Sequence, residues 1–246
     1  MTHPVALITG SARRIGAETA RHLHRQGFNL LLHYRSSYNE VKQLADTFNR
    51  ERNHSAVAIA AELADTHAID ALAKQALQPW GRLDVLINNA SSYYPTPFGK
   101  VTENQWDDLL ASNTKAPFFL SQALAPYLRK QRGCIVNIAD IHAERPLMEY
   151  SPYTIAKAGN AMLTKSLARE LAPEVRVNGI APGVIIWPED AAELADNDKQ
   201  HILKQVPLGH VGEAADIAKT VVFFVQDAPY ITGQILAVDG GRSIYL

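Results

Sequence analysis

The sequence of 246 residues has a single cysteine, Cys134, and no long hydrophobic run. One cysteine cannot form an internal disulfide, so nothing points to an oxidising compartment. The apolar neighbours of Cys134 are typical of a buried strand. No segment is long enough to span a bilayer, and residues 1–5 lack the basic stretch and apolar core of a signal peptide. We therefore expect a cytoplasmic protein that binds no membrane.

An excess of charge of either sign is also absent. Lysine and arginine number 24 and acidic residues 25, a formal net charge of −1. Proteins that bind nucleic acids usually show a basic excess or stripe, so no such partner is expected. His22 and His24 lie on a predicted helix but face different ways, and the sequence has no His-Glu-x-x-His motif. We interpret both as surface histidines and expect no metal.

Short β-rich runs alternate with longer helical patterns, which is typical of a parallel sheet joined by helices. The near-continuous apolar character of the strands indicates burial on both faces. With 47% hydrophobic residues, the chain is long enough for one large α/β domain. The sequence predicts a single-domain, Rossmann-type, doubly wound, seven-stranded parallel sheet with helices on both faces. Predicted strands are Val5–Thr9, Phe28–His33, Ala56–Ala61, Asp84–Asn88, Gly133–Ile138, Arg176–Ile180 and Gln234–Val238. Predicted helices extend from Gly10 to about Gln26 and over Asn39–Asn53, His67–Trp80, Lys115–Gln131, Pro152–Leu171 and Ala214–Gln226.

The region 184–212 is long for a connection and contains Pro188 and Pro207. Long loops over binding clefts are often lids. A short helical insertion fits the sequence equally well. We expect a substrate loop region here.

The first predicted strand ends in a glycine-containing turn that opens the first helix. Gly10 permits a tight turn, and Gly16 permits close packing at the helix start. Backbone N–H groups and the helix dipole at such a turn favour a pyrophosphate. Arg14 occupies the middle glycine position of this motif, so its side chain and that of Arg13 are expected to reach the phosphates or an acceptor on the substrate. The turn residues expected to contact the cofactor are Gly10, Arg13, Arg14, Ile15 and Gly16.

The end of the second strand reads His33-Tyr34-Arg35-Ser36-Ser37 and contains no acid. A protein that binds NAD usually has an acid here for the ribose hydroxyls. Arg35 offers a planar fork of donors, and the serines offer hydroxyls, which suits a ribose 2′-phosphate. The sequence therefore favours NADPH/NADP+, with His33, Tyr34, Arg35 and Ser36 as cofactor contacts. Tyr34 or Arg35 is also suited to stacking on the adenine.

Glu62 and Leu63 follow the third strand. Both are expected near the adenine, where the Glu62 carboxylate would accept from the amino group. A solvated glutamate at a strand end is an equally good interpretation.

Tyr153 and Lys157 are four residues apart on a predicted helix and so share one face. Ser151 is the expected N-cap, with Pro152 as the first helical residue. A tyrosine titrates near pH ~10, and a nearby ammonium group lowers that value. The pair is therefore expected to relay a proton near neutral pH, with Lys157 also bonding the nicotinamide ribose.

Over essentially its whole length, the sequence resembles the short-chain dehydrogenase/reductase family. The resemblance implies that Asn113 supports a proton relay through the lysine, that Asn89 stabilises the central sheet, and that the protein is a homotetramer. It also places Ala90, Pro182 and Gly183 against the cofactor. Besides the turn and the Tyr–Lys pair, the matching motifs are Asn88-Asn89-Ala90, Ser112-Asn113, Arg176-Val177-Asn178, Pro182-Gly183 and Val238-Asp239-Gly240-Gly241.

The sequence departs from the pattern of most members at two positions. Ser91 stands where many have glycine, and Asp140, 13 residues before Tyr153, stands where most have a catalytic serine. An aspartate accepts from N–H groups or feeds a proton through the tyrosine, which suits a ring with N–H or C=N groups better than a ketone. A solvated strand-end Asp140 in a carbonyl reductase is the alternative.

These departures resemble the pteridine reductase branch. The branch implies that a pterin stacks between the nicotinamide and the ring of Tyr93. It also implies that Ser91 bonds cofactor and pterin, and that Arg14 lies near the pterin and the phosphates. The matching residues are Thr9-Gly10, Arg14-Ile15-Gly16, His33-Tyr34-Arg35-Ser36, Asn88 to Pro97, Asp140, Tyr153 and Lys157.

The resemblance implies hydride transfer from NADPH to a C=N bond of a pterin, such as dihydrobiopterin or dihydrofolate. Asp140 and Tyr153 would supply the proton, while Lys157 would orient the ribose. One alternative is an NADPH-dependent carbonyl reductase acting on 3-oxoacyl thioesters or ketones. Another is a non-catalytic NADPH sensor, against which the intact Tyr153 and Lys157 argue.

Overall fold

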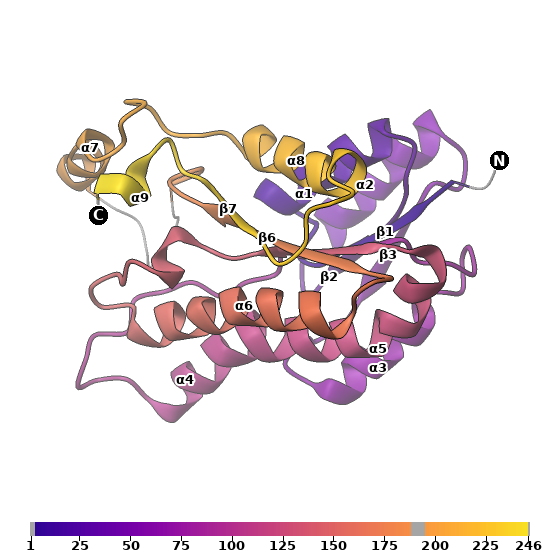
Figure 1. Cartoon of the computed structure of the whole chain (residues 1–246), viewed down its shortest axis with the longest axis horizontal. Helices are drawn as coiled ribbons and strands as arrows, with labels where there is room; N and C mark the ends of the chain where they lie inside the picture. The colour runs from indigo at the N-terminus through magenta and orange to yellow at the C-terminus, as the bar shows by residue number, and fades with distance from the viewer. Residues whose placement is uncertain (1–2, 188–194, 246) are drawn as a thin grey trace.

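The computed structural model describes residues 3–187 and 195–245. The predicted sheet is confirmed: seven strands, all parallel, lie in the order β3-β2-β1-β4-β5-β6-β7 (Figure 1). The strands are β1 Val5–Ile8, β2 Asn29–Tyr34, β3 Ala56–Ala60, β4 Val85–Asn88, β5 Cys134–Ile138, β6 Arg176–Pro182 and β7 Ile235–Val238. The helices are α1 Arg14–Arg25, α2 Tyr38–Glu51, α3 Thr66–Gln75, α4 Glu103–Leu110, α5 Ala116–Gln131, α6 Ser151–Glu170, α7 Asp196–Lys204, α8 Ala214–Val222 and α9 Arg242–Tyr245. Short π-helical segments cover Ala111–Lys115 and Phe223–Asp227, and a 3-10 turn covers Ile141–Ala143.

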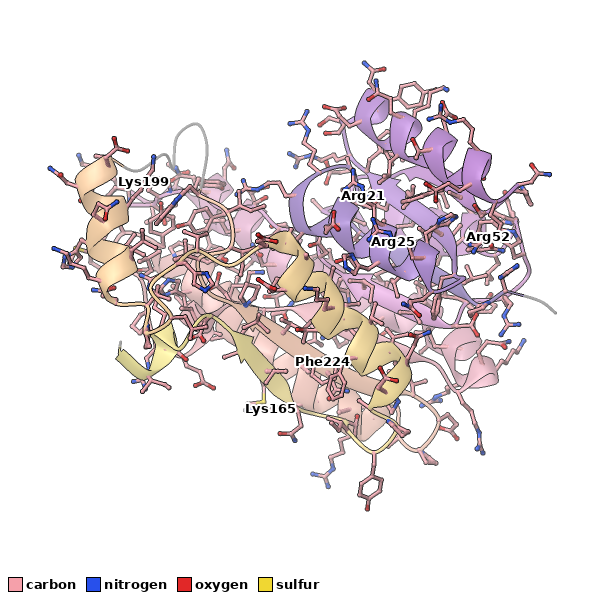
Figure 2. The ribbon with its side chains drawn as sticks, turned by 90° about the horizontal axis from the view of Figure 1, so that it is seen from above. Arg21, Arg25, Arg52, Lys165, Lys199 and Phe224 are labelled. Carbon is pink, nitrogen blue, oxygen red and sulfur yellow. The ribbon has the colours of Figure 1, made fainter. Side chains whose placement is uncertain are left out.

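Helices cover both faces of the sheet, as predicted. One face packs against α1, α2 and α8, and the other against α3, α5 and α6 (Figure 1). Figure 2, seen from above, shows α8 lying beside α1 on the first face, with Phe224 just beyond the end of α8. Strands β1, β4 and β5 are buried at every position. Their near-continuous apolar sequence follows from this two-sided burial, because each side chain meets a helix layer whichever way it points.

The strand order reverses direction between β1 and β4, which are neighbours in the sheet. The chain leads from β1 outward to β3 on one side, and from β4 outward to β7 on the other. In doubly wound sheets, ligands bind in the crevice at the carboxyl ends of the strands, at the point of reversal. Here the glycine turn follows β1, Asn89 follows β4, and Asp140 follows β5 closely.

Several local predictions differ from the structure. Helix α4 was not expected, although Thr102 and Gln105 form a capping box at its start, and this sequence pattern marks helix beginnings. Ser151 is the first residue of α6 rather than its N-cap, and Tyr150 takes the N-cap position without a side-chain bond.

His24 is not a surface histidine. Its ring is 5% exposed, stacks on Phe48 with 4.4 Å between ring centroids, and its Nε2 lies 2.9 Å from the Ser55 hydroxyl. The prediction of a surface position for His24 is therefore wrong, because the side chain is part of the packing between α1 and α2. In residues 3–187 and 195–245, no cluster of three or more His, Cys, Asp or Glu side chains is arranged to hold a metal ion.

The region 184–212 contains α7, so its described part includes a short helix. Pro188 lies outside the described residues, and Pro207 lies inside them. Among the described helices, none combines the length and apolar character needed to cross a membrane.

Gly133 holds the start of β5, the strand that leads to Asp140, against its neighbour. A Cβ at this position would lie 2.2 Å from the carbonyl oxygen of Asp84. We predict that Gly133→Ala lowers the free energy of unfolding by about 3 kcal/mol, the upper range for overpacked sites, as measured by urea denaturation.

Gly209→Ala is the matched control, because φ is +72° there and no atom lies within 4 Å of the added carbon. Only the left-handed backbone is strained in that variant, which costs about 1 kcal/mol. Equal losses in the two variants would contradict the steric explanation.

Candidate active site

A cavity of about 610 Å³ opens at the carboxyl end of the sheet. Loops after β1 to β6, the start of α6 and the C-terminal segment form its wall. Among the predicted site residues, all but Asn113 line it. These are Gly10, Arg13, Arg14, Ile15, Gly16, His33, Tyr34, Arg35, Ser36, Glu62, Leu63, Asn89, Ala90, Ser91, Tyr93, Asp140, Tyr153, Lys157, Pro182 and Gly183.

The glycine turn is packed so closely that side chains are excluded at two positions. Gly10 has φ of +61°, and a Cβ on Gly16 would lie 2.2 Å from the Gly10 carbonyl oxygen. The Asn89 side-chain amide donates to the carbonyl oxygens of Thr9, at 2.9 Å, and of Gly10, at 3.0 Å. The first turn of α1 therefore approaches the crevice with its backbone bare, as close binding of a pyrophosphate requires.

The two arginines of the turn go different ways. Arg14 has φ of +51°, a conformation that favours glycine, and it donates to the carbonyl oxygens of Ile186, at 3.2 Å, and Trp187, at 3.0 Å. Arg14 thereby joins the glycine turn to the loop after β6. Arg13 forms an ion pair with Glu40 on α2.

Both ring nitrogens of His33 form hydrogen bonds with backbone groups. Its Nδ1 accepts from the Gly10 N–H at 3.1 Å, and its Nε2 lies 3.1 Å from the Ala61 carbonyl oxygen. Burial lowers the pKa of His33, so the ring is neutral and carries its proton on Nε2, where it donates to Ala61. The ring fixes the glycine turn to the ends of β2 and β3.

Arg35 and Ser36 lie exposed beyond β2. In the described part of the chain, the Arg35 guanidinium makes no hydrogen bond or ion pair, and no acid replaces it at this strand end. Glu62 accepts from the Ala64 N–H at 3.0 Å, so one of its oxygens is used locally. This end of the cavity presents donors and a positive charge, as the sequence predicted.

The Tyr153 hydroxyl donates to Asp140 Oδ2 at 2.6 Å, and Asp140 Oδ1 accepts from the His142 N–H at 2.8 Å. Burial, followed by the negative charge of Asp140, raises the pKa of Tyr153 well above its ordinary value. The expectation that Lys157 lowers this pKa is wrong. Tyr153 is held as a neutral phenol bonded to a carboxylate.

Lys157 lies on the ring side of Tyr153. Its Nζ is 5.7 Å from the centroid of that ring and donates to the Ile138 carbonyl oxygen at 2.9 Å. Burial lowers the pKa of Lys157 to about 8, although Asp140 opposes the shift. A shared helix face thus brings ammonium and phenol together, but Asp140 takes the hydroxyl.

Asn113 lies behind the cavity wall, in the π-helical segment 111–115. Its Oδ1 accepts from the Ser91 hydroxyl at 2.7 Å, and its Nδ2 donates to the carbonyl oxygens of Ser92 and Leu109 at 3.0 and 2.9 Å. Its own carbonyl accepts from Asn160 at 2.8 Å. The side chain therefore fixes the loop that begins at Ser91.

Three tyrosines form an aromatic cluster at the cavity. The ring of Tyr93 stacks on Tyr150, with 4.8 Å between centroids and 19° between planes. It also meets Tyr153 edge-on at 4.9 Å. Sequence reasoning missed Tyr150 as a site residue, although it lies three residues before Tyr153. Nothing in the local pattern indicated that it would pack on a ring from the loop after β4.

Arg242 is a second residue that the sequence did not indicate. It lines the cavity and is 7% exposed, and it follows directly after the Val238–Gly241 motif. The motif drew attention to the glycines, but no spacing rule linked the next residue to Asp140. His142, Ile202 and Trp187 also line the cavity.

The family model described as Enoyl-(Acyl carrier protein) reductase matches residues 10–243 of the chain. Pteridine reductase 1 of Leishmania tarentolae is 36% identical over 284 aligned positions, which cover 99% of this chain and 97% of the relative. The 3-oxoacyl-[acyl-carrier-protein] reductase FabG of Staphylococcus aureus is 36% identical over 239 positions, covering 96% of each chain.

A third relative is subunit BbsD of the (2S)-[(R)-hydroxy(phenyl)methyl]succinyl-CoA dehydrogenase of Thauera aromatica. It is 36% identical over 244 positions, covering 98% of this chain and 97% of its own. These relatives are all oxidoreductases by name, each covers at least 96% of the chain, and the family model spans strands β2 to β7 and the site. The chain belongs to the short-chain dehydrogenase/reductase family and is an NAD(P)H-dependent oxidoreductase.

Proposed function

We propose that the protein is an NADPH-dependent pteridine reductase, which reduces a C=N bond of an oxidised or dihydropterin. The proposal rests on one observation, the hydrogen bond of 2.6 Å from Tyr153 to Asp140 beside the ring of Tyr93. A carboxylate and a phenol together offer an acceptor for ring N–H groups and a proton for a ring nitrogen. The flat ring of Tyr93, whose centroid lies 4.9 Å from that of Tyr153, offers a surface for a planar heterocycle.

The chain has the residues to hold the cofactor. Gly10 and Gly16 leave the start of α1 bare for the pyrophosphate, and Arg35 and Ser36 suit the 2′-phosphate. At the cavity wall after β6, a Cβ on Gly183 would lie 2.6 Å from the Asp239 Cβ. The loop after β6 is therefore packed closely against the segment that follows β7. NADPH supplies the hydride when bound. Asn89, Ala90, Ser91, Tyr153, Lys157, Pro182 and Gly183 line the portion assigned to the nicotinamide and its ribose.

The proton comes from the Asp140–Tyr153 pair. Because the pKa of Tyr153 is raised, the phenol keeps its proton until a substrate nitrogen accepts it. As the carbon of C=N gains the hydride, the nitrogen gains this proton and an N–H bond forms. Asp140 accepts from a neighbouring ring N–H, and the ammonium of Lys157 stabilises the negative charge that remains.

Stacking fixes the heterocycle in place. Tyr150 packs on one face of Tyr93 and so limits how that ring tilts. A planar substrate held against an oriented ring loses little further freedom when it reacts, and this proximity lowers the barrier. Arg14 and Ser91, which line the same cavity, are assigned to the substrate as well.

Reduction of 3-oxoacyl thioesters is the second candidate, because the FabG relative matches the chain at the same identity, 36%, as the pteridine reductase. Tyr153 and Lys157 serve a carbonyl substrate equally well. Asp140 does not, since an ionised carboxylate has no proton to donate to a carbonyl oxygen. A homotetrameric assembly and a cytoplasmic location stay predictions.

We predict that the purified protein oxidises NADPH in the presence of dihydrobiopterin or dihydrofolate. The reaction is measured as the loss of the near-ultraviolet absorbance of NADPH. The expected kcat/KM with the better pterin exceeds that with an acetoacetyl thioester by at least about tenfold. A higher kcat/KM with the thioester favours the second candidate, and no turnover of any pterin rejects the proposal.

Arg35→Gln tests the cofactor assignment. Loss of a charge-assisted hydrogen bond to the 2′-phosphate is expected to raise the KM for NADPH about tenfold or more. The KM for NADH, which lacks that phosphate, stays unchanged. Arg50→Gln on the exposed side of α2 is the control and leaves both values as in the wild type. Parallel increases for NADPH and NADH would show that Arg35 does not select the phosphate.

Lys157→Met is predicted to abolish turnover while stabilising the cofactor-free protein by about 1–3 kcal/mol at pH 7. Below pH 8 the lysine is charged in both folded and unfolded chains, so the folded state bears the full penalty of burial. Between pH 8 and 10.5 the folded lysine is already neutral while the unfolded one is charged, so wild-type stability rises.

The difference between Lys157→Met and wild type should therefore shrink as pH rises from 7.5 to 9.5, measured by urea denaturation at each pH. Lys165→Met, on the exposed side of the same helix, serves as the control with no such trend. A pH-independent difference for Lys157→Met would contradict a lowered pKa of this lysine.

A further inference from the structure

Arg242 is a charged side chain that the proposed chemistry does not use. It begins the short C-terminal helix α9, is 7% exposed, and lines the cavity. Burial lowers the pKa of Arg242, and the negative charge of Asp140 opposes the shift. Arg242 lines the same cavity as Asp140 and Tyr93, the residues assigned to the substrate. A guanidinium so far removed from solvent normally has partners, because an unpaired buried cation is destabilising.

Within the described chain, Arg242 has no such partner. Its Nε is buried without a hydrogen bond, and no other side-chain bond joins it to residues 3–187 or 195–245. The nearby carboxylates accept hydrogen bonds from other groups. Asp239 accepts from the N–H groups of Gly241, at 2.9 Å, and Ser243, at 2.6 Å, while Asp140 accepts from Tyr153 and His142. The Arg242 guanidinium is therefore a donor at the cavity wall for which the described residues provide no acceptor.

We propose that Arg242 is a specificity-determining residue that donates hydrogen bonds to an oxygen acceptor of the substrate. Arginine has five N–H donors in a planar fork and no acceptor, and this fork matches carbonyl and carboxylate oxygens. Asp140 lines the same cavity and is a hydrogen-bond acceptor, so it supplies the opposite function to the Arg242 donors. Together the two side chains suit a substrate edge on which an oxygen stands beside an N–H group.

This inference rests on the proposed function, because the lactam edge of a pterin carries a carbonyl oxygen next to a ring N–H. The same donors also suit a carboxylate on a substrate side chain. Both sources share one chemistry, an oxygen that accepts from the guanidinium. They differ in where the oxygen lies, and two pterins separate them: dihydrobiopterin has the ring carbonyl alone, while dihydrofolate also has carboxylates.

The test compares Arg242→Gln and Arg242→Lys with wild type on these two pterins. Recognition of the ring carbonyl raises the KM of Arg242→Gln at least about tenfold for both substrates. Recognition of a carboxylate raises it for dihydrofolate alone. Either result supports the proposal. Arg169→Gln, on the exposed side of α6, is the matched control and leaves both KM values unchanged.

Arg242→Lys separates the planar fork of donors from the positive charge, because a lysine ammonium still donates hydrogen bonds but only as a compact point cation. Lysine keeps the positive charge beside Asp140 but lacks the planar fork, so the KM stays raised while the pH profile of kcat/KM matches the wild type. An unchanged KM in Arg242→Gln overturns the proposal. Full recovery of the KM in Arg242→Lys overturns it as well, because charge acting through Asp140 would then suffice. The dissociation constant for NADPH and the Tm of each variant verify that the site remains folded.

Failure of the proposed function gives a different result. Wild-type protein would then oxidise no NADPH with either pterin, and the same variants would be compared on acetoacetyl thioester, whose carbonyl oxygens are the acceptors. A raised KM in Arg242→Gln supports the inference there, and an unchanged KM rejects it.

Discussion

The contact between the ends of β1 and β4 determines the rest of the site. The Thr9 hydroxyl accepts from the N–H groups of Asn89, at 2.9 Å, and Ala90, at 3.0 Å, while the Asn89 side chain donates to Thr9 and Gly10. These bonds close the sheet at the point where its strand order reverses. They leave no room for a side chain on Gly16, so the phosphate turn and the loop that carries Ser91 and Tyr93 are held by one set of contacts.

At the substrate end, burial determines the protonation states. Tyr153, Lys157 and Arg242 are all removed from solvent, and for each of them burial is the largest cause of the pKa shift. Each shift favours the neutral form, and the charge of Asp140 counteracts it for the two cations. Asp140 thus opposes the loss of charge on Lys157 and Arg242, and it adds to the effect of burial on the pKa of Tyr153.

The sequence predicted the sheet well because strands buried on both faces have an unambiguous apolar pattern, and the turn at Gly10 shows where the first one ends. Local spacing also placed Lys157 on the Tyr153 side of α6. The resemblance implied that Asp140 acts together with Tyr153. Local spacing alone could not show their direct hydrogen bond, because that bond depends on how β5 and α6 pack. His33 stays a predicted cofactor contact and lines the cavity. Local patterns did not reveal that its ring also bonds with Gly10 and Ala61 and so joins three strand ends that lie apart in sequence.

The glycine turn and the Tyr153–Lys157 pair do not decide the substrate. A bare glycine turn binds a pyrophosphate, and a tyrosine beside a lysine delivers a proton, whether the acceptor is an imine or a carbonyl. The choice of substrate depends instead on the residues proposed to contact the substrate. Asp140 accepts hydrogen bonds, Arg242 donates them, and Tyr93 offers a flat ring, so their combined requirement is a planar molecule with an oxygen and an N–H on one edge. An acyl thioester has the oxygens but neither the ring nor the N–H at the reacting end. Asp140 already accepts from Tyr153 and His142 and would gain no further donor from the thioester, whereas a ring N–H adds a hydrogen bond to it. The polar residues around the cavity therefore favour the heterocycle.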